Sequence, residues 1–265
     1  MRGRAAIALG VGAGIAAGGA VIAVADATNG PAAAAPRARV HLAPPPARPA
    51  LAIPAPTGLD DGPDVTRWAH VRTATVARMV PRRSAAVAGR LAERTPEGTD
   101  TVVPVTGRRE DAGGRLWLRV TLPVLPNGTS GWVPRRALGG YRISRDKLVI
   151  DLDAQRLTLL RRGKAALRAP VGVGQARWPT PRGHFIVRNR LERFASPAYG
   201  PVAFGTSARS ATLTDWPSGG FIGIHGTDQP GILPGRVSHG CIRLRNPAIL
   251  RLARLMPVGT PVEIR

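Results

Sequence analysis

Short runs of β type, separated by turns, make up most of the sequence after residue 65. Between residues 65 and 140 these runs are rich in β-branched residues and partly alternate between apolar and polar positions. Turn signals such as Asn127-Gly128 separate them. Similar runs return from residue 145 to the end of the chain. The chain is therefore predicted to be mainly β, with one unit at 65–140 and a second at 145–265.

The second unit contains the clearest strand predictions. Strands are expected at Leu148–Leu152, Arg156–Leu160 and Ala165–Val173, with a tight turn at Arg161–Lys164 between the second and third. The segments HFIVRNRL and GFIGIHG are further strand candidates, and PVEIR is expected to close the chain as the last strand.

One short helix is predicted in the second unit, directly after its cysteine. Asn246 suits the N-cap and Pro247 suits the first turn. Apolar residues then recur at helical spacing, which predicts a buried face. That face consists of Ile249, Leu250, Leu252, Ala253 and Met256.

The first 64 residues differ in character from the rest. Residues 1–27 combine two early arginines, an uncharged stretch at 5–25 and a small-x-small site, which predicts a secretory signal peptide or a signal anchor. Residues 28–64 are rich in Pro and Ala, which predicts an extended linker. The remainder is therefore expected to be exported to the cell envelope, on the wall side of the membrane, with 5–25 as the anchor if the signal is retained.

Basic residues outnumber acidic residues by 38 to 16, a formal net charge of +22. Such an excess is compatible with nucleic-acid binding. The basic residues are scattered singly or in pairs, however, and no recognition-helix, zinc-finger or RNP-type pattern accompanies them. The charge therefore favours attraction to an anionic surface, such as lipid head groups or a cell-wall polymer, over a nucleic-acid partner.

Cys241 is the only cysteine of the chain, so it cannot form an internal disulfide. A lone cysteine is most often buried and inert. The preceding Gly240 argues against that interpretation, because a position without a Cβ lets a ligand or another backbone approach closely. The amides of Gly240 and Cys241 could then face a developing oxyanion, with the thiol as nucleophile.

Two histidines are candidates for the base that accepts the thiol proton. His225 ends a predicted strand in which it shares one face with Gly223, and His239 lies two residues before Cys241. The sequence does not choose between them. A zinc site is the other interpretation, but it lacks a fourth ligand and any Cys-x-x-Cys spacing, so no metal is expected.

The first unit resembles a known module. Trp117, Leu118 and Val120, followed by a turn and by Gly131–Pro134, are similar to the end of a bacterial SH3-like barrel. The resemblance covers about 70 residues of the chain. It implies binding or positioning without chemistry, and a role as a plain spacer is an equal alternative.

The second unit resembles the L,D-transpeptidase (YkuD-type) catalytic domain. The resemblance rests on His225-Gly226-Thr227, on the segment Ser238–Arg243 (SHGCIR) and on the upstream segment Thr180–Phe185 (TPRGHF). It also includes the opening strands from Leu148 and extends over the whole second unit. It implies a β-sandwich of the L,D-transpeptidase type and no cofactor.

The resemblance also implies roles for individual residues. Cys241 would be the nucleophile and His225 its proton acceptor and donor. Ser238, His239 and Gly240 would shape the oxyanion pocket. The implied substrate-binding residues are Gly226, Thr227 and Arg243, the last of which could pair with a substrate carboxylate.

The implied reaction is acyl transfer on peptidoglycan. The thiolate would attack a tetrapeptide stem, release D-alanine and form a thioester, and an amine of a neighbouring stem would then complete a 3→3 cross-link. Carbapenem-type β-lactams would acylate the same cysteine. A carboxypeptidase or stem hydrolase and a non-catalytic wall-binding protein are the alternatives, and the presence of both Cys241 and His225 argues against the second.

Overall fold

The computed structural model describes residues 65–192, 196–213 and 219–265. The predicted signal at 1–27 and the predicted linker at 28–64 lie outside the described residues. Within the described ranges, strands dominate and α1 (Asn246–Leu255) is the only α-helix. No helix in these ranges has the length and apolar character needed to cross a membrane. The mainly β fold class is confirmed.

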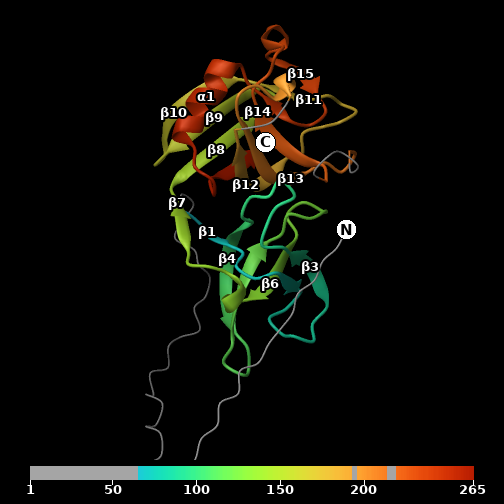
Figure 1. The fold of residues 1–265 in the computed structure, drawn as a ribbon, viewed down its shortest axis with the longest axis vertical. Coiled ribbons are helices and arrows are strands. Elements are labelled where there is room, and N and C mark those ends of the chain that lie inside the picture. Colours follow the sequence, from blue (N-terminus) through green and yellow to red (C-terminus); the bar gives the residue numbers. More distant parts are fainter. Residues whose placement is uncertain (1–64, 193–195, 214–218) are drawn as a thin grey trace, which may run out of the picture. The chain divides into compact units, whose positions relative to one another are not determined.

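The first unit is a seven-stranded sheet with the order β3-β2-β6-β5-β4-β1-β7 (Figure 1). Neighbouring strands in it pair antiparallel. Aliphatic side chains from alternate positions form its buried core. A β unit is therefore present where one was predicted, and its SH3-like character stays a prediction. The elements of this unit are β1 (Thr66–His70), β2 (Thr75–Arg78), β3 (Val87–Leu91), β4 (Val102–Glu110), β5 (Leu116–Thr121), β6 (Ser130–Pro134), the 3-10 turn η1 (Arg135–Ala137) and β7 (Arg142–Ser144).

The second unit is a ten-stranded sheet with the order β10-β9-β8-β17-β12-β13-β14-β16-β11-β15. Three of its pairings are parallel: β8 with β17, β14 with β16, and β11 with β15. Its strands are β8 (Asp146–Asp151), β9 (Arg156–Arg161), β10 (Lys164–Pro170), β11 (Gly172–Gly174), β12 (Gly183–Leu191), β13 (Ala203–Arg209), β14 (Phe221–His225), β15 (Gly235–Ser238), β16 (Ile242–Arg243) and β17 (Pro261–Ile264). Two 3-10 turns complete it, η2 (Pro197–Tyr199) and η3 (Pro230–Ile232).

Strand β12 turns this ladder into a β-sandwich. Its first half, Gly183–Ile186, pairs with β17, whereas its second half, Val187–Leu191, pairs with β13. A strand that passes from one layer to the other makes the corner of a sandwich. The two layers enclose one core of buried aliphatic residues, to which both contribute.

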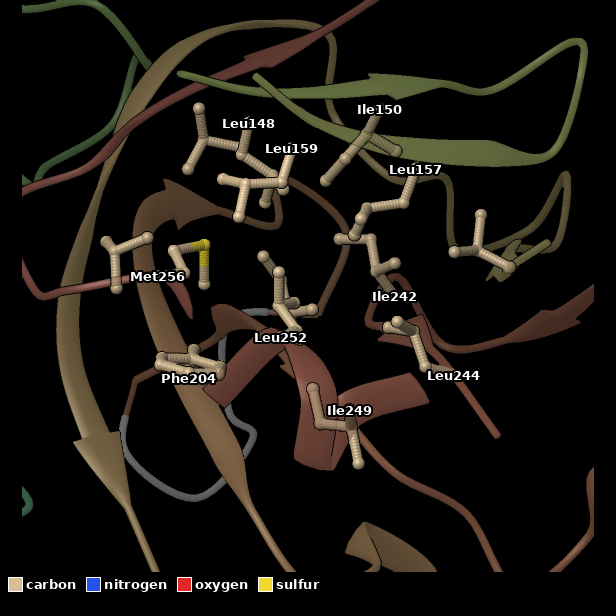
Figure 2. Close-up of a cluster of buried hydrophobic side chains, with 14 of the residues drawn as sticks. Leu148, Ile150, Leu157, Leu159, Phe204, Ile242, Leu244, Ile249, Leu252 and Met256 are labelled. Carbon is tan, nitrogen blue, oxygen red and sulfur yellow. The ribbon is translucent and has the colours of Figure 1, made fainter. Parts of the chain in front are cut away.

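Helix α1 supplies part of that core. Ile249 and Leu252 of the helix and Leu157 and Leu159 of β9 are labelled in Figure 2, and all four belong to the same buried cluster. Burial of such side chains stabilises a fold by about 1.5–3 kcal/mol each. The helix thereby stabilises the chain directly after β16.

Most of the predicted elements are confirmed. The predicted turn at Arg161–Lys164 joins β9 to β10, and both central residues have positive φ, 49° at Arg162 and 76° at Gly163. Such angles at both positions match the right-handed twist of a hairpin. Strands HFIVRNRL, GFIGIHG and PVEIR also lie where they were predicted.

Three predictions of local structure were wrong. The strand expected at Ala165–Val173 ends at Pro170, and the next strand, β11, pairs elsewhere, with β15 and β16. Asn246 does not cap the helix: Arg245 is the N-cap residue, and the Asn246 side chain bonds another segment. Leu250 is 43% exposed and so lies off the buried face. Each difference reflects packing with distant segments, which helical or strand periodicity does not encode.

Candidate active site

Strand β14 carries two of the residues that define the site. Ile222 and Ile224 point into the core and are buried, as the period of two requires. Gly223 and His225 therefore share the opposite face. A Cβ placed at Gly223 would lie 3.7 Å from Cys241 Sγ and 3.7 Å from His225 Cδ2. The glycine thus lies next to the side chains of both candidate catalytic residues.

Cys241 is held in the short connection between β15 and β16. Gly240, just before it, has a φ of +113°, a conformation that L side chains rarely adopt. The sulfur accepts a hydrogen bond from the Gly223 amide at 3.3 Å. Burial raises the pKa of the Cys241 thiol, while the Gly223 amide and the charge of Arg243 act in the opposite direction.

His225 is buried and its ring orientation is set by its own backbone. Its Nδ1 lies 2.6 Å from the carbonyl oxygen of Gly226. Because a carbonyl oxygen only accepts, Nδ1 carries the hydrogen and Nε2 of the neutral ring has a free lone pair. Burial lowers the pKa of His225 to about 4, which outweighs the Gly226 hydrogen bond; Arg243 lowers it further. The ring is therefore a neutral proton acceptor at neutral pH.

A cavity of about 370 Å³ opens in front of these groups. It is lined by Cys241 and His225, and also by His239, Arg243, Tyr199 and Phe221. The ring centroid of Tyr199 is 4.6 Å from that of His225. Four of the residues predicted from the sequence, Cys241, His225, His239 and Arg243, are therefore brought to one cavity. His225 and His239 both line it, and the contact with the Gly226 carbonyl defines the tautomer of His225.

His239 also packs against a neighbouring ring. Its ring centroid is 4.1 Å from that of Trp178, which in turn lies 4.7 Å from the Arg177 guanidinium carbon. The stack explains how His239 stays at the wall of the cavity, two residues before the cysteine.

Ser238 acts on the backbone rather than on the cavity. It is fully buried, and its Oγ accepts a hydrogen bond from the Gly240 amide at 3.1 Å and donates one to the Cys241 carbonyl at 2.6 Å. The Gly240 amide is thereby occupied, which speaks against its predicted place in an oxyanion hole. The Cys241 amide stays the predicted donor.

Gly226 and Thr227 are not among the residues that line the cavity, and their contact with substrate stays a prediction. Both are buried. The Thr227 amide donates to Asn246 Oδ1 at 3.0 Å, and a Cβ at Gly226 would lie 2.3 Å from the same oxygen. Their observed role is to hold the loop that follows His225 against the start of α1.

Arg243 is the cationic group of the cavity. Its Nε is buried and has no hydrogen-bond partner among the described residues. A guanidinium group at the wall of a cavity is suited to bind a carboxylate of a ligand. Within the described ranges, no cluster of three or more His, Cys, Asp or Glu side chains is placed to hold a metal ion.

Sequence reasoning missed two contributors to the site. Gly223 was placed on the face of His225, but the bond from its amide to sulfur follows from the parallel pairing of β14 with β16. Phe221, at the start of β14, lines the cavity and lies 3.9 Å from the guanidinium carbon of Arg188. No short-range pattern signals either role, because each depends on a partner 18 or more residues away.

The segment that contains the site is similar in sequence to L,D-transpeptidases. The YkuD proteins of Bacillus licheniformis and Bacillus subtilis, both named as L,D-transpeptidases, are 33% and 32% identical over 118 and 117 residues. Each alignment covers 44% of this chain and 64% of the relative, so the chain spans just under two thirds of their length. A solved structure of the Enterococcus faecium L,D-transpeptidase is 25% identical over 45% of this chain and 49% of its own, with a TM-score of 0.37. Residues 145–264, which contain the whole site, match the family model of the YkuD L,D-transpeptidase catalytic domain.

Proposed function

We propose that this protein is an exported cysteine L,D-transpeptidase that forms 3→3 cross-links in peptidoglycan. The observation that carries the proposal is the placement of Cys241 Sγ and His225 beside Gly223 at one cavity, inside the segment that matches the family. A thiol and a neutral imidazole so arranged form a nucleophile and its base.

The resting state is a neutral thiol beside a neutral imidazole. Burial raises the pKa of Cys241 and lowers the pKa of His225 to about 4, so a preformed thiolate–imidazolium pair is disfavoured at neutral pH. His225 Nε2 then takes the thiol proton as the sulfur attacks. The Gly223 amide stabilises the negative charge that develops on sulfur.

The first half-reaction is acylation. The sulfur forms a bond to the stem carbonyl carbon, and the carbonyl oxygen becomes an oxyanion opposite the Cys241 amide. The tetrahedral species collapses as the C–N bond to D-alanine breaks. The protonated His225 gives its proton to the leaving amine, and a thioester on Cys241 is left.

The second half-reaction transfers the acyl group. An amine of a neighbouring stem attacks the thioester carbonyl and gives its proton to His225. The C–S bond breaks, the sulfur recovers the proton, and the new amide is the cross-link. Water in place of the amine would make the same site a stem hydrolase.

The surroundings of the site suit a charged peptide. Arg243 offers a cation to a carboxylate of the donor stem. The net charge of +22 favours residence at an anionic wall or membrane surface, where residues 5–25 would act as signal or anchor. We further expect carbapenem-type β-lactams to acylate Cys241, since a strained lactam carbonyl presents the same electrophile.

The proposal is tested by intact mass after incubation of the full chain with a carbapenem, with Cys241→Ala alongside. One adduct on the wild type and none on the variant is the expected result, followed by 3→3 dimers from purified disaccharide-tetrapeptides. Release of D-alanine without dimers would make the protein a hydrolase. A folded wild type that gains no adduct and forms no product would overturn the proposal.

A further inference from the structure

Two buried threonines make the same pair of backbone contacts on either side of the site. Thr180 is 5% exposed; its hydroxyl donates to the Gly240 carbonyl at 2.7 Å and accepts from the Gly174 amide at 2.9 Å. Thr206 is fully buried; its hydroxyl donates to the Ile222 carbonyl at 2.7 Å and accepts from the Ala208 amide at 3.2 Å.

Each of these carbonyls shares a peptide group with an amide that faces the chemistry. In a trans peptide the C=O and N–H bonds lie in one plane and point in opposite directions. The Ile222 carbonyl therefore shares its plane with the Gly223 amide, which donates to Cys241 Sγ. The Gly240 carbonyl shares its plane with the Cys241 amide. A hydroxyl that holds the carbonyl also aims the amide at the other end.

The contact of Thr206 replaces a bond that the sheet does not make there. The register between β13 and β14 shifts between Gly205 and Arg209, so regular pairing is interrupted around Ile222. Bulges of this kind re-aim groups near active sites. The result is a continuous series of hydrogen bonds from the Thr206 hydroxyl through the Ile222–Gly223 peptide to the sulfur, and such series polarise one another.

The contact of Thr180 acts on a peptide that has more freedom. Gly240 has no Cβ to restrict its dihedral angles, and its φ of +113° is open to a glycine that is free to rotate. The loop that carries Thr180 lies against it: a Cβ at Gly240 would be 3.7 Å from the Pro179 carbonyl oxygen. The hydroxyl of Thr180 holds the carbonyl of this peptide, while Ser238 holds the flanking Gly240 amide and Cys241 carbonyl.

We propose that Thr206 and Thr180 are positioning residues, the first for the amide that stabilises the nucleophilic sulfur and the second for the amide that stabilises the oxyanion. The Thr180 half rests on the proposed acyl transfer. The Thr206 half concerns only the reactivity of the thiol and stands on the observed contact between the Gly223 amide and sulfur.

Two reactions of Cys241 separate these roles. Iodoacetamide alkylation forms a C–S bond and expels iodide while the thiol proton leaves, so no oxyanion arises. Carbapenem acylation opens the lactam through an oxyanion. Both rates are measured against pH for Thr→Val and Thr→Ser variants at 180 and 206. The other ionisable side chains that line the cavity with Cys241 are unchanged throughout; they are Tyr199, His225, His239 and Arg243.

For Thr206→Val we expect alkylation at neutral pH to fall about threefold to tenfold, with its pH profile displaced upward, and acylation to fall in parallel. For Thr180→Val we expect the alkylation rate to stay within about twofold of the wild type. The acylation rate should fall about tenfold to a hundredfold, which does not exceed the effect of removing a whole oxyanion donor. The serine variants keep the hydroxyl and should restore both rates to within about threefold.

Thr260→Val is the matched control. Thr260 is also fully buried and donates to a carbonyl, that of Pro257 at 2.8 Å, but it does not line the cavity. It should leave both rates unchanged. If a valine variant does not fold, as judged by its unfolding midpoint, the alanine variant replaces it.

The proposal is overturned if Thr180→Val lowers both rates equally, if Thr206→Val leaves the alkylation profile in place, or if Thr260→Val reproduces either effect. If the wild type is alkylated but never acylated, the proposed transferase function is wrong, and so is the role proposed for Thr180. The alkylation profile would still decide the Thr206 half.

Discussion

His225 Nδ1 and the carbonyl oxygen of its own neighbour, Gly226, lie 2.6 Å apart. Catalytic imidazoles are often oriented by a carboxylate, but here the chain itself supplies the acceptor. A neutral acceptor adds no negative charge beside the ring, so the Gly226 hydrogen bond offsets the desolvation of an imidazolium only in part. Burial accordingly lowers the pKa of His225 to about 4.

The rate of acylation should therefore stay high in mildly acidic solution. His225 accepts a proton only in its neutral form, which persists down to about pH 4. We expect the acidic limb of the carbapenem acylation rate to lie near pH 4. A profile with its midpoint near 6.5, the ordinary pKa of histidine, would contradict the burial of the ring in the free protein.

The free energy of unfolding should decrease as the pH falls from 6.5 to about 4. Between pH 6.5 and about 4 the unfolded chain binds a proton at residue 225 that the folded chain does not, so the free energy of unfolding decreases as the pH falls. The contribution of this group is about 3 kcal/mol. Denaturant unfolding at several pH values should show that decrease in the wild type, and His225→Gln should show a correspondingly shallower one.

Gly226→Ala should disturb both stability and catalysis. The new methyl group would lie 2.3 Å from Asn246 Oδ1 and 3.0 Å from the Cα of Gly200, so the loop must move. We expect the free energy of unfolding to fall by about 1–3 kcal/mol. Acylation should also slow, since the Gly226 carbonyl orients the ring of His225. Gly231→Ala is the control, because nothing lies within 4 Å of its Cβ position. Equal unfolding midpoints for the two variants would refute the prediction.

Glu97→Gln should destabilise the folded protein strongly. Glu97 accepts from the nearly buried Arg188 at 2.7 Å and from Asn189 at 3.1 Å. Loss of the carboxylate leaves the Arg188 charge uncompensated, which destabilises by about 3 kcal/mol. Because Arg188 lies over the ring of Phe221, acylation should slow as well.

Glu192→Gln provides the comparison for Glu97→Gln. Glu192 pairs with Arg190, and both side chains are well exposed. Pairs of that kind contribute less than about 1 kcal/mol. Urea unfolding should therefore separate the two variants, and similar shifts in both would argue that the burial of Arg188 has no energetic consequence.

Arg243→Gln should weaken binding of the donor stem through its carboxylate. A charge-assisted hydrogen bond is worth about 1.5–3 kcal/mol, so KM for a tetrapeptide should rise about tenfold to a hundredfold. A donor with an amide at its C-terminus should lose nothing further in the variant. Arg251→Gln, an exposed change on α1, should leave KM unaltered. The same rise in KM for acid and amide donors would rule out the carboxylate as the partner.

Local chemistry explains why much of the fold was predictable. The turn at Arg162-Gly163 needs two positive φ angles, and the helix after residue 245 needs a proline early and apolar residues at helical spacing. These requirements act within a few residues. The alternation in β14 likewise placed Gly223 and His225 on one face before their partners were known.

The differences between the expected and the observed surroundings of individual residues share one origin. Asn246 has the chemistry of a helix cap, yet its side chain bonds the Thr227 amide, 19 residues away. Gly226 and Thr227 lie next to a catalytic candidate in sequence, yet packing against α1 buries them. Proximity along the chain does not say which face of a loop is open, because that depends on what packs over it.

The sequence by itself determined the mainly β class and the helix after the cysteine, since periodicity and turn residues act within short stretches. It also singled out Cys241 as the candidate nucleophile, with His225 as its partner only through the resemblance to a family. Only the tertiary structure decided which amide faces the sulfur, which hydroxyls hold the peptides beside it and which motif residues reach the cavity. Those outcomes depend on strand register, on a bulge between β13 and β14 and on segments from 16 to 60 residues apart, and such long-range contacts form only when the whole sandwich is assembled.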